Sequence, residues 1–542
     1  MVIETNRDRV LHAVLERQAV SYGNRTFLYF NDREFSYQDF NREAGRVACA
    51  LQRLGVAKGD KVAIVMDNCP EFLFLWFGLS KLGAIEVPIN TAHKGEVLSY
   101  MMRQSDSCLL IVQSRYLDRV VPVLAEADKV KTVVVLDEGA GGTLVGADIT
   151  VRLGAGLGKR VLDWVEIVDN DGSYRPAEVT WSDPYAILYT SGTTGLSKGV
   201  LMPHNLAINS VENLCRTINL GEGDCVYNVL PLFHNGAQLL SAVPALMVGA
   251  RLVLAERFSA SRFWDDVRRH GCTECSYTGG ITSILYNSEP RPDDADNPLR
   301  VMLGGGIPRD IHEAFEKRFG VPLIEFYGMT ETGPPTMNDL VNRKPGSCGR
   351  LHPNYTVKVV DDDGLEVGPN TPGELLVRSS TPYSMLLEYY GMPEKTVEAW
   401  RDLWFHTGDC LSYDEEGYFY FMDRKKDAMR RRGENISSYE VERVVNSHPA
   451  VLESAAVAVK SGLGDDEVLV CLTLNPGESL TPLELTAYCE ERMAYFMVPR
   501  YLRFMESMPK TPTLRIQKQR LRDDGVTVDT WDREKAGYKL KR

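Results

Sequence analysis

The chain has 542 residues, of which 44% are hydrophobic and 25% charged, so it is long enough for two or more domains and leaves no room for extensive disorder. Its formal net charge of -13 argues against a nucleic-acid coat or a protein that binds anionic membranes. Any polyanionic ligand must therefore meet local donors.

The N-terminus does not look like a targeting segment. Its first ten residues, MVIETNRDRV, are mixed and charged, without the apolar stretch of a signal peptide. The most apolar run, residues 71–89, is interrupted by Ser80 and Lys81 after eight apolar residues, well short of the roughly 20 that span a bilayer. The 11 cysteines are scattered and odd in number, which fits a reducing compartment. We therefore expect a cytoplasmic protein without a membrane span, with a buried helix and then a strand in residues 71–89.

Hydrophobic periodicity changes twice along the chain. Up to about residue 350, strand-like runs such as KVAIVM and YAILYT alternate with amphipathic helical runs, which is typical of βαβ units. Short alternating segments such as GELLVRS then indicate antiparallel hairpins. A charged run near residues 423–427 precedes a helix, a strand and a further helix. We predict an α/β fold: a large domain at 1–422, with layered βαβ sheets and a β-rich subdomain, and a small mobile α+β domain at 423–542.

A glycine-rich segment, YTSGTTGLSKGV at residues 189–200, follows an apolar strand and precedes a helical run. It combines three glycines, several hydroxyls and Lys198, which suits a flexible loop that grips polyphosphate. It is not a Walker A loop, because Lys198 does not directly follow a glycine of that pattern. Taken alone, the segment fits a phosphate loop and a plain turn equally well.

The same segment resembles the signature loop of adenylate-forming enzymes, which include acyl-CoA synthetases, peptide-synthetase adenylation domains and luciferases. Further segments resemble the successive motifs of this family in the same order: PLFHNGAQ (231–238), GGGIP (304–308), YGMTETG (327–333), GELLVRS (373–379), WFHTGD (404–409) and DRKKDAMRRRGENISSYEVE (423–442). The resemblance covers residues 25 to 522. It implies an acid–thiol ligase that uses ATP or its AMP moiety, CoA and Mg²⁺.

The resemblance also implies a role for each matching residue. Nucleotide and CoA contacts would come from Thr190, Ser191, Gly192, Thr193, Thr194, Gly195, Lys198, Gly305, Gly306, Tyr327, Asp409, Arg424 and Gly433. Tyr327 would stack on adenine, Thr330 would donate to the α-phosphate and Glu331 would bind Mg²⁺. Asp409 would hold the ribose hydroxyls, and Lys426 would be the hinge of the small domain. Outside this context, each would be an ordinary turn or surface residue.

The acyl site is the least determined part. A lone histidine beside apolar residues, such as His234, is more often a satisfied core residue than a catalyst. The resemblance places His234 between the acyl pocket and the thiol channel, where it would act as a gate. Substrate contacts would come from Asn235, Gly236, Gly279, Gly280 and Gly304. These small residues suggest room for a bulky, rigid, apolar acid such as a polycyclic or terpenoid acid, although glycines that the fold requires would look the same.

One motif departs from the family. PKTPTLRIQK at residues 509–518 resembles PxTPTGKIQK, but Leu514 replaces the glycine and Arg515 the lysine, while Lys518 remains. In the family this lysine serves only adenylation. The planar guanidinium of Arg515 cannot be assumed to take the place of an ammonium, and Leu514 is bulkier than glycine. Losing one well-placed donor costs about 10²- to 10³-fold in rate. We therefore predict that adenylation is weak or lost.

Three hypotheses follow. In the first, the protein transfers the acyl group from an acyl-adenylate, supplied by a separate adenylating enzyme, to CoA. In the second, it is a complete ATP-dependent ligase in which Arg515 or Lys518 substitutes for the lysine. In the third, it binds nucleotide or acyl groups without turnover. We favour the first, with free CoA as acceptor because no carrier domain follows residue 542.

Overall fold

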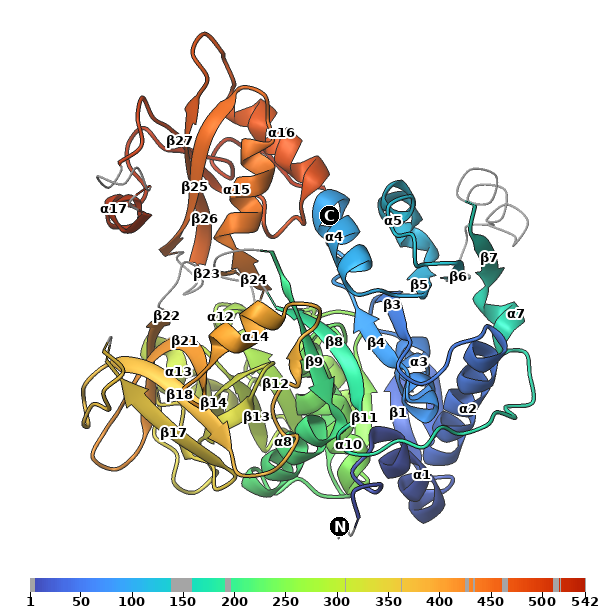
Figure 1. Cartoon of the computed structure of the whole chain (residues 1–542). Helices are drawn as coiled ribbons and strands as arrows, with labels where there is room; N and C mark the ends of the chain where they lie inside the picture. The colour runs from blue at the N-terminus through green and yellow to red at the C-terminus, as the bar shows by residue number, and fades with distance from the viewer. Residues whose placement is uncertain are drawn as a thin grey trace.

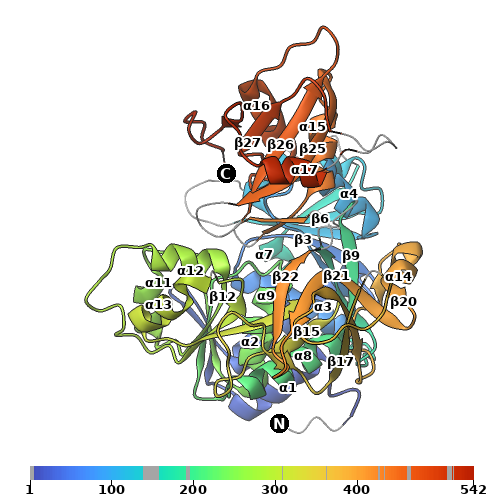
Figure 2. The same ribbon diagram turned by 90° about the vertical axis from the view of Figure 1, so that its left-hand side faces the viewer.

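The computed structural model describes residues 5–137, 158–190, 196–307, 309–361, 363–424, 428–431, 434–460, 466–509, 516 and 518–541. The N-terminal part, up to residue 424, carries three sheets, and a smaller C-terminal unit, residues 428–541, sits over it (Figures 1 and 2). The large and small parts agree with the expected α/β architecture. The boundary at 423–427 stays a prediction, since residues 425–427 lie outside the described residues.

An eight-stranded sheet has the order β19-β9-β8-β4-β3-β5-β6-β7. Its strands are β3 (Lys61–Val65), β4 (Ile85–Pro88), β5 (Leu109–Gln113), β6 (Thr132–Leu136), β7 (Arg160–Asp163), β8 (Pro184–Thr190), β9 (Lys198–Pro203) and β19 (Glu388–Tyr389). The strands from β8 to β7 are parallel, while β9 and β19 add an antiparallel edge. The glycine-rich segment therefore joins two strands of a hairpin.

The helical run expected after the glycine-rich segment is present, but a strand comes first. Strand β9 pairs antiparallel with β8, in a register that sets Thr190 opposite Lys198, and helix α8 (His204–Thr217) begins directly after β9. The sequence did not predict this strand.

A nine-stranded sheet has the order β16-β15-β14-β13-β12-β10-β11-β1-β2. Its strands are β1 (Thr26–Phe30), β2 (Arg33–Ser36), β10 (Cys225–Asn228), β11 (Arg251–Leu254), β12 (Glu274–Thr278), β13 (Val301–Gly305), β14 (Leu323–Met329), β15 (Gly333–Met337) and β16 (Arg350–Leu351). The run from β14 to β1 is parallel. Its carboxyl ends therefore meet at one edge, where ligands of parallel α/β sheets bind.

The third sheet is the β-rich subdomain that the short alternating segments predicted. It consists of β17 (Tyr355–Val360), β18 (Gly373–Ser379), β20 (Trp400–Arg401), β21 (Trp404–Tyr413) and β22 (Phe419–Arg424), all paired antiparallel. The C-terminal unit has a hairpin, β23 (Ala428–Arg431) and β24 (Glu434–Ser437), and a four-stranded sheet of β25 (Val451–Lys460), β26 (Asp466–Leu474), β27 (Tyr501–Phe504) and β28 (Trp531–Asp532).

Helices cover these sheets. The N-terminal part carries α1 (Leu11–Tyr22), α2 (Tyr37–Arg53), α3 (Pro70–Leu82), α4 (Gly95–Gln104), the turn η1 (Ser114–Tyr116), α5 (Leu117–Leu124), α7 (Trp164–Val168), α8, α9 (Asn235–Ala237), the π-helix η2 (Gln238–Ala242), α10 (Val243–Val248), α11 (Phe263–His270), α12 (Gly279–Tyr286), α13 (Arg309–Phe319) and α14 (Pro393–Ala399). The C-terminal unit carries α15 (Ser438–Asn446), α16 (Pro482–Arg492) and α17 (Lys518–Asp524).

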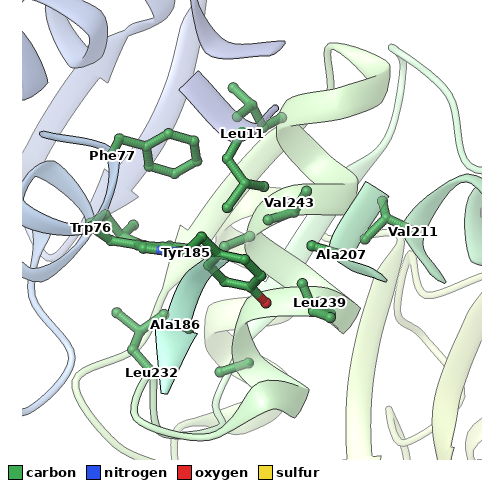
Figure 3. Close-up of a cluster of buried hydrophobic side chains, with 14 of the residues drawn as sticks. Leu11, Trp76, Phe77, Tyr185, Ala186, Ala207, Val211, Leu232, Leu239 and Val243 are labelled. Atoms are coloured by element: carbon green, nitrogen blue, oxygen red, sulfur yellow. The ribbon is translucent and has the colours of Figure 1, made fainter. Parts of the chain in front are cut away.

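The apolar run at residues 71–89 forms a buried helix and strand, as expected. Pro70 opens α3, Gly83 closes it at a φ of +65°, and all residues of the helix except Glu71 are buried. Among the described residues, no helix is long and apolar enough to cross a membrane. Trp76 and Phe77 of α3 instead pack into a core cluster shared with β8 and α8 (Figure 3).

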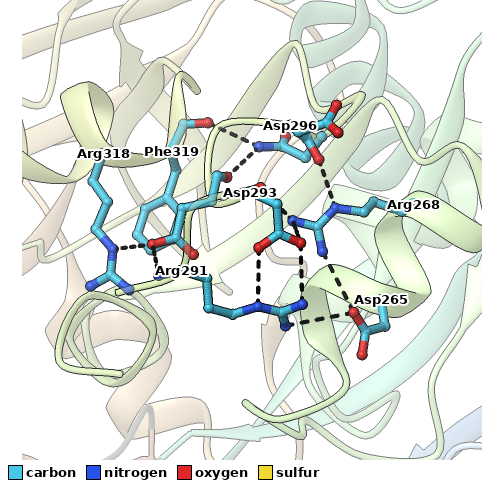
Figure 4. Close-up of polar contacts among 9 residues, drawn as sticks. Asp265, Arg268, Arg291, Asp293, Asp296, Arg318 and Phe319 are labelled. Carbon is cyan, nitrogen blue, oxygen red and sulfur yellow. Dashed lines mark hydrogen bonds and ion pairs between the residues drawn. The ribbon is translucent and has the colours of Figure 1, made fainter. Parts of the chain in front are cut away.

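Charged residues brace the connection between α11 and α13. Arg318 of α13 pairs with the buried Asp294 at 2.7 Å, and Arg268 of α11 pairs with Asp293 at 3.3 Å (Figure 4). The Arg268–Asp293 pair is partly exposed and contributes little by itself. Several pairs on one loop together fix the path of the chain from α12 to α13.

A buried charge cluster joins α13 to β14. His312, 2% exposed, lies 3.4 Å from a carboxylate oxygen of Glu316 and 3.4 Å from one of Glu325, and Arg343 also contacts Glu316. Burial opposes charge on His312, but the two carboxylates outweigh it and raise its pKa to about 9. Burial likewise opposes charge on Glu316, yet His312 and Arg343 lower its pKa to about 2.

We predict that this cluster makes stability depend on pH. Because the pKa of folded His312 lies above its ordinary 6.5, the contribution is fully present below pH 6.5 and is lost as pH rises through about 9. The free energy of unfolding, measured with urea, should fall between pH 6 and pH 9.5 by up to about 3 kcal/mol more in wild type than in His312→Gln. His448→Gln, in the C-terminal unit, is the control. Equal pH dependence of wild type and His312→Gln would contradict the assignment.

Candidate active site

A cleft of 2560 Å³ lies at the carboxyl ends of β10, β12, β13 and β14. Its lining includes these residues named from the sequence: Thr190, Lys198, His234, Asn235, Gly236, Gly279, Gly280, Gly304, Gly305, Gly306, Tyr327, Thr330, Glu331 and Asp409. The C-terminal unit adds Arg430, Glu434, Lys460, Asp466 and Tyr495. Motifs that are far apart in the sequence thus meet around one space.

Some expected site residues cannot be placed. Ser191, Gly192, Thr193, Thr194, Gly195, Lys426, Gly433, Leu514 and Arg515 lie outside the described residues, as does the side chain of Arg424. The backbone of Arg424 is described and pairs with Asp409 across β21 and β22. The roles expected for these residues stay predictions.

One wall of the cleft, the proposed phosphate wall, is lined by Thr190, Lys198, Glu331 and Tyr389. Glu331 is 4% exposed, and one of its carboxylate oxygens accepts hydrogen bonds from Tyr389 at 3.0 Å and Thr190 at 3.4 Å. The ammonium of Lys198 lies 4.0 Å from the centroid of the Tyr389 ring. The β8–β9 hairpin places Thr190 and Lys198 side by side, and β19 brings Tyr389 against β9. Tyr389 was not predicted as a site residue. Its one signal in the sequence is the pair of adjacent tyrosines at 389–390.

The same wall fits Mg²⁺. A buried carboxylate in a cleft is the hard oxygen donor that this ion prefers. Among the described residues, no group of three or more His, Cys, Asp and Glu side chains could hold a metal ion. A cation at Glu331 would therefore complete its coordination with phosphate oxygens and water.

A second wall presents an aromatic ring beside a carboxylate. The hydroxyl of Tyr327, at the end of β14, donates to Asp409 of β21 at 2.8 Å, and both residues are nearly buried. Phe421 of β22 stacks at 6.3 Å and 23° from the Tyr327 ring and is 44% exposed in the cleft. The backbone amide of Asp409 donates to Thr407 at 3.1 Å, which fixes the turn. A flat ring and a diol-binding carboxylate are thus held together, as a nucleoside site requires.

The glycines in the cleft have different reasons to be small. A Cβ on Gly279 would lie 1.9 Å from the Gly306 carbonyl oxygen, and one on Gly304 would lie 2.2 Å from the Tyr277 carbonyl oxygen. Close backbone packing therefore requires both. A Cβ on Gly236 would meet only the side chains of Leu230 and Leu240, at ordinary distances of 3.5 Å and 3.8 Å. Of these three, Gly236 alone leaves space that the fold does not demand.

The opposite side of the cleft is mostly apolar. Its lining includes Leu214, Leu239, Leu240, Phe258, Ile281 and Ile284. Leu239 and Leu240 come from the π-helix η2, a widened turn that is frequent at functional sites. Two hydrogen bonds fix Leu232 in the loop before α9. Asn68 accepts from the Leu232 amide at 2.7 Å, and Gln238 donates to the Leu232 carbonyl at 2.9 Å. The sequence did not reveal this brace.

The C-terminal unit reaches into the cleft through Glu434 of β24. His234 donates from Nε2 to Glu434 at 2.9 Å, and Asn90 donates to the same oxygen at 3.2 Å. Burial opposes charge on His234, but Glu434 outweighs it and raises the pKa of His234. Burial opposes charge on Glu434 as well, yet His234 lowers the pKa of Glu434. The sequence named His234, but not the partner that sits one residue after Gly433.

Two basic residues near the C-terminus lie away from the cleft. Lys518 pairs with Glu442 at 2.7 Å and donates to the Ser438 hydroxyl at 2.9 Å, so its ammonium faces α15, and it is not among the described residues that line the cleft. Arg431 lies in a run of basic residues, which is usually a solvated face. It is 3% exposed and pairs with Glu467 at 2.7 Å, because its charge is used inside the C-terminal unit.

Comparison with known proteins agrees with this geometry. Residues 15–390 match the model of the "AMP-binding enzyme" family, and residues 440–514 match the "AMP-binding enzyme C-terminal domain". A crotonobetaine/carnitine–CoA ligase from Salmonella paratyphi A (strain ATCC 9150 / SARB42) is 34% identical over 92% of this chain and 96% of that protein.

Solved structures share the fold. The anthranilate CoA ligase AuaEII, in complex with anthranoyl-AMP, is 26% identical with a TM-score of 0.71, over 96% of this chain and 98% of that one. The o-succinylbenzoate CoA synthetase of Bacillus subtilis, 24% identical, has a TM-score of 0.80 over 94% of this chain and 98% of that one. The chain therefore belongs to the AMP-binding enzyme family and is an acid–thiol ligase of the acyl-CoA synthetase type.

Proposed function

We propose that the protein forms an acyl-CoA thioester from CoA and the acyl-adenylate of a bulky apolar acid, and that its adenylation half-reaction is weak or lost. The observation that carries this proposal is the position of the C-terminal unit. Glu434 reaches His234 in the cleft, while Lys518 is held on α15, away from it. This arrangement suits thiol transfer, and the sequence motif that contains Arg515 departs from the family at the residue that serves adenylation.

The cleft supplies what thiol transfer needs. The adenylate would lie with its base against Tyr327, its ribose at Asp409 and its phosphate near Thr330 and Lys198. The thiol sulfur bonds to the acyl carbon, the carbon–oxygen bond to phosphate breaks, and AMP leaves with that electron pair while the thiol proton passes to solvent. Donors at the phosphate stabilise the leaving charge. Mg²⁺, where bound at Glu331, would neutralise phosphate charge.

His234 is a gate in this proposal, not a general base. Its pairing with Glu434 favours the imidazolium, which cannot accept a proton. The same pairing draws the ring toward the C-terminal unit. We infer that this opens the path along which the pantetheine thiol enters, and that Gly433, next to Glu434, lines that path.

The acid is proposed from the apolar wall. Burying an apolar group against Leu239, Leu240 and Ile281 stabilises binding by about 25 cal/mol per Å². Gly236 leaves space beside them, whereas Gly279 and Gly304 do not support a large pocket. A polycyclic or terpenoid acid fits such a wall, and the unusual diterpenoid-acid CoA ligase of platensimycin-type antibiotic biosynthesis is the kind of enzyme that this combination resembles. In that setting a separate adenylating enzyme would supply the acyl-AMP in the cytoplasm.

A complete ATP-dependent ligase is the second candidate. The Salmonella relative, named as a CoA ligase, matches 92% of this chain, and Thr190, Lys198, Glu331 and Asp409 are all assembled in the cleft. Arg515 or Lys518 would then have to replace the lysine. A binding protein without turnover has less support, since a protein that only binds would not need these four residues together in the cleft.

The two half-reactions separate these candidates. We expect thioester formation from synthetic acyl-AMP and CoA at rates at least 10²-fold above pyrophosphate release from acid and ATP, because only the latter needs the replaced lysine. Chromatographic detection of acyl-CoA and an enzymatic pyrophosphate assay measure them. Pyrophosphate release at the same rate as thioester formation would sink the proposal, and inactivity in both assays across many acids would leave a binding protein.

Restoring the family residues should restore adenylation. We expect the double variant Leu514→Gly/Arg515→Lys to release pyrophosphate about 10²-fold faster than wild type, while thioester formation from acyl-AMP changes less than threefold. Arg520→Lys, on α17 beyond the motif, is the matched control for an added lysine. If the double variant gains nothing, the cause of slow adenylation lies elsewhere.

The gate should depend on the charge of Glu434. Glu434→Gln removes the attraction that holds the His234 imidazolium, so we expect the KM for CoA to rise about tenfold with acyl-AMP as co-substrate. Since pairing raises the pKa of His234, the CoA-dependent rate of wild type should fall at higher pH than that of the variant. Glu478→Gln, on an exposed turn of the C-terminal unit, is the control. Identical pH profiles of wild type and Glu434→Gln would speak against gating.

A further inference from the structure

A second carboxylate of the C-terminal unit also contacts the N-terminal part. One oxygen of Glu440, in the first turn of α15, accepts from the Ser197 amide at 3.1 Å and from the Ser197 hydroxyl. Glu440 is 5% exposed and Ser197 2% exposed. A buried carboxylate that accepts two hydrogen bonds is costly to separate from its donors. This contact therefore resists movement of α15 away from β9.

Ser197, which makes this contact with the C-terminal unit, lies at the edge of the phosphate wall. Ser197 directly precedes Lys198, whose ammonium lies over Tyr389, and Tyr389 in turn donates to Glu331. The hydroxyl of Tyr100 in α4 donates to the Ser197 carbonyl at 3.0 Å. Ser197 thus has hydrogen-bond partners on both α4 and α15, so Glu440 binds a residue that is already held in place beside the cleft.

The same helix also binds Lys518, the first residue of α17. Glu442 pairs with Lys518 at 2.7 Å, and Ser438 accepts from Lys518 at 2.9 Å. Two residues of an α-helix are separated by about 200°, so Glu440 and Glu442 point to opposite sides of α15. One side meets the phosphate wall while the other holds the segment that follows Arg515. Rotating the unit to bring that segment to the cleft would break the Glu440–Ser197 contact.

We infer that Glu440 is a positioning residue for thioester formation: its hydrogen bonds to Ser197 hold the C-terminal unit in the arrangement that brings Glu434 to His234. The inference rests on the proposed function. A second pair across this interface, Arg443 with Glu96, is weaker because their side chains are 33% and 58% exposed and screened by solvent. Glu440 is the buried anchor of the interface, and it touches neither substrate nor reacting atoms.

Kinetics of the two half-reactions test the assignment. In the Leu514→Gly/Arg515→Lys background, we expect Glu440→Ala to lower the kcat of thioester formation from acyl-AMP about 10- to 100-fold, while pyrophosphate release stays within about twofold. Glu440→Gln keeps an acceptor oxygen and should recover most of the loss. Ser197→Ala combined with Glu440→Ala should cost little more than Glu440→Ala alone. Equal losses in both half-reactions, or an equal loss with Arg443→Ala, would overturn the inference.

A distance measurement keeps this test separate from the proposed function. Nitroxides introduced through unnatural amino acids at the exposed positions Val397 and Leu483 report the arrangement of the two parts by pulsed electron paramagnetic resonance. Wild type with AMP should give one dominant distance, and Glu440→Ala should shift population to a second. An unchanged distribution in Glu440→Ala overturns the inference whether or not the enzyme makes thioesters. A shifted distribution supports it even if the natural acyl donor is not the one tested.

Discussion

The structure depends on a pair of side chains that joins its two parts across the cleft. His234 comes from a loop after β10, and Glu434 comes from the hairpin that opens the C-terminal unit, 200 residues later. The side chain of His234 is 40% exposed and that of Glu434 is 16% exposed, and each shifts the pKa of the other toward the charged form. The pair therefore favours the arrangement in which both charges are present and Glu434 lines the cleft.

Much of the fold was readable because local pattern and global structure agree. The run at residues 71–89 becomes α3 and β4, and GELLVRS becomes the central strand β18 of an antiparallel sheet. Strand β9 was not predicted, because pairing with β8 defines it and the periodicity of KGVLMP does not. The burial of Arg431 could not be predicted, because a run of charges gives no sign that one of them has a buried partner at Glu467.

The site divides in the same way. Motif residues such as Tyr327, Glu331 and Asp409 could be named because the chemistry of their side chains and the family resemblance point to the same roles, and the structure brings them to one cleft. Tyr389 and Glu434 escaped, since their importance lies in contacts with residues 58 and 200 positions away. The glycines show the reverse error. Gly279 and Gly304 suggested an open pocket, but each is small because a carbonyl oxygen passes where its Cβ would be.

Helix α15 connects the cleft contact of the C-terminal unit with the position of Lys518. Because Glu440 and Glu442 leave the helix on opposite sides, contact with the phosphate wall and retention of Lys518 occur in the same position of the C-terminal unit. In the proposed function, residue 515 would reach the cleft only after α15 has left Ser197. A change at residue 515 that harms adenylation can therefore leave the Glu434–His234 arrangement untouched, which is the condition under which a ligase could lose its first half-reaction and keep its second. The departure from the family motif at Arg515 and the contacts of α15 thus both support the proposed division between the two half-reactions.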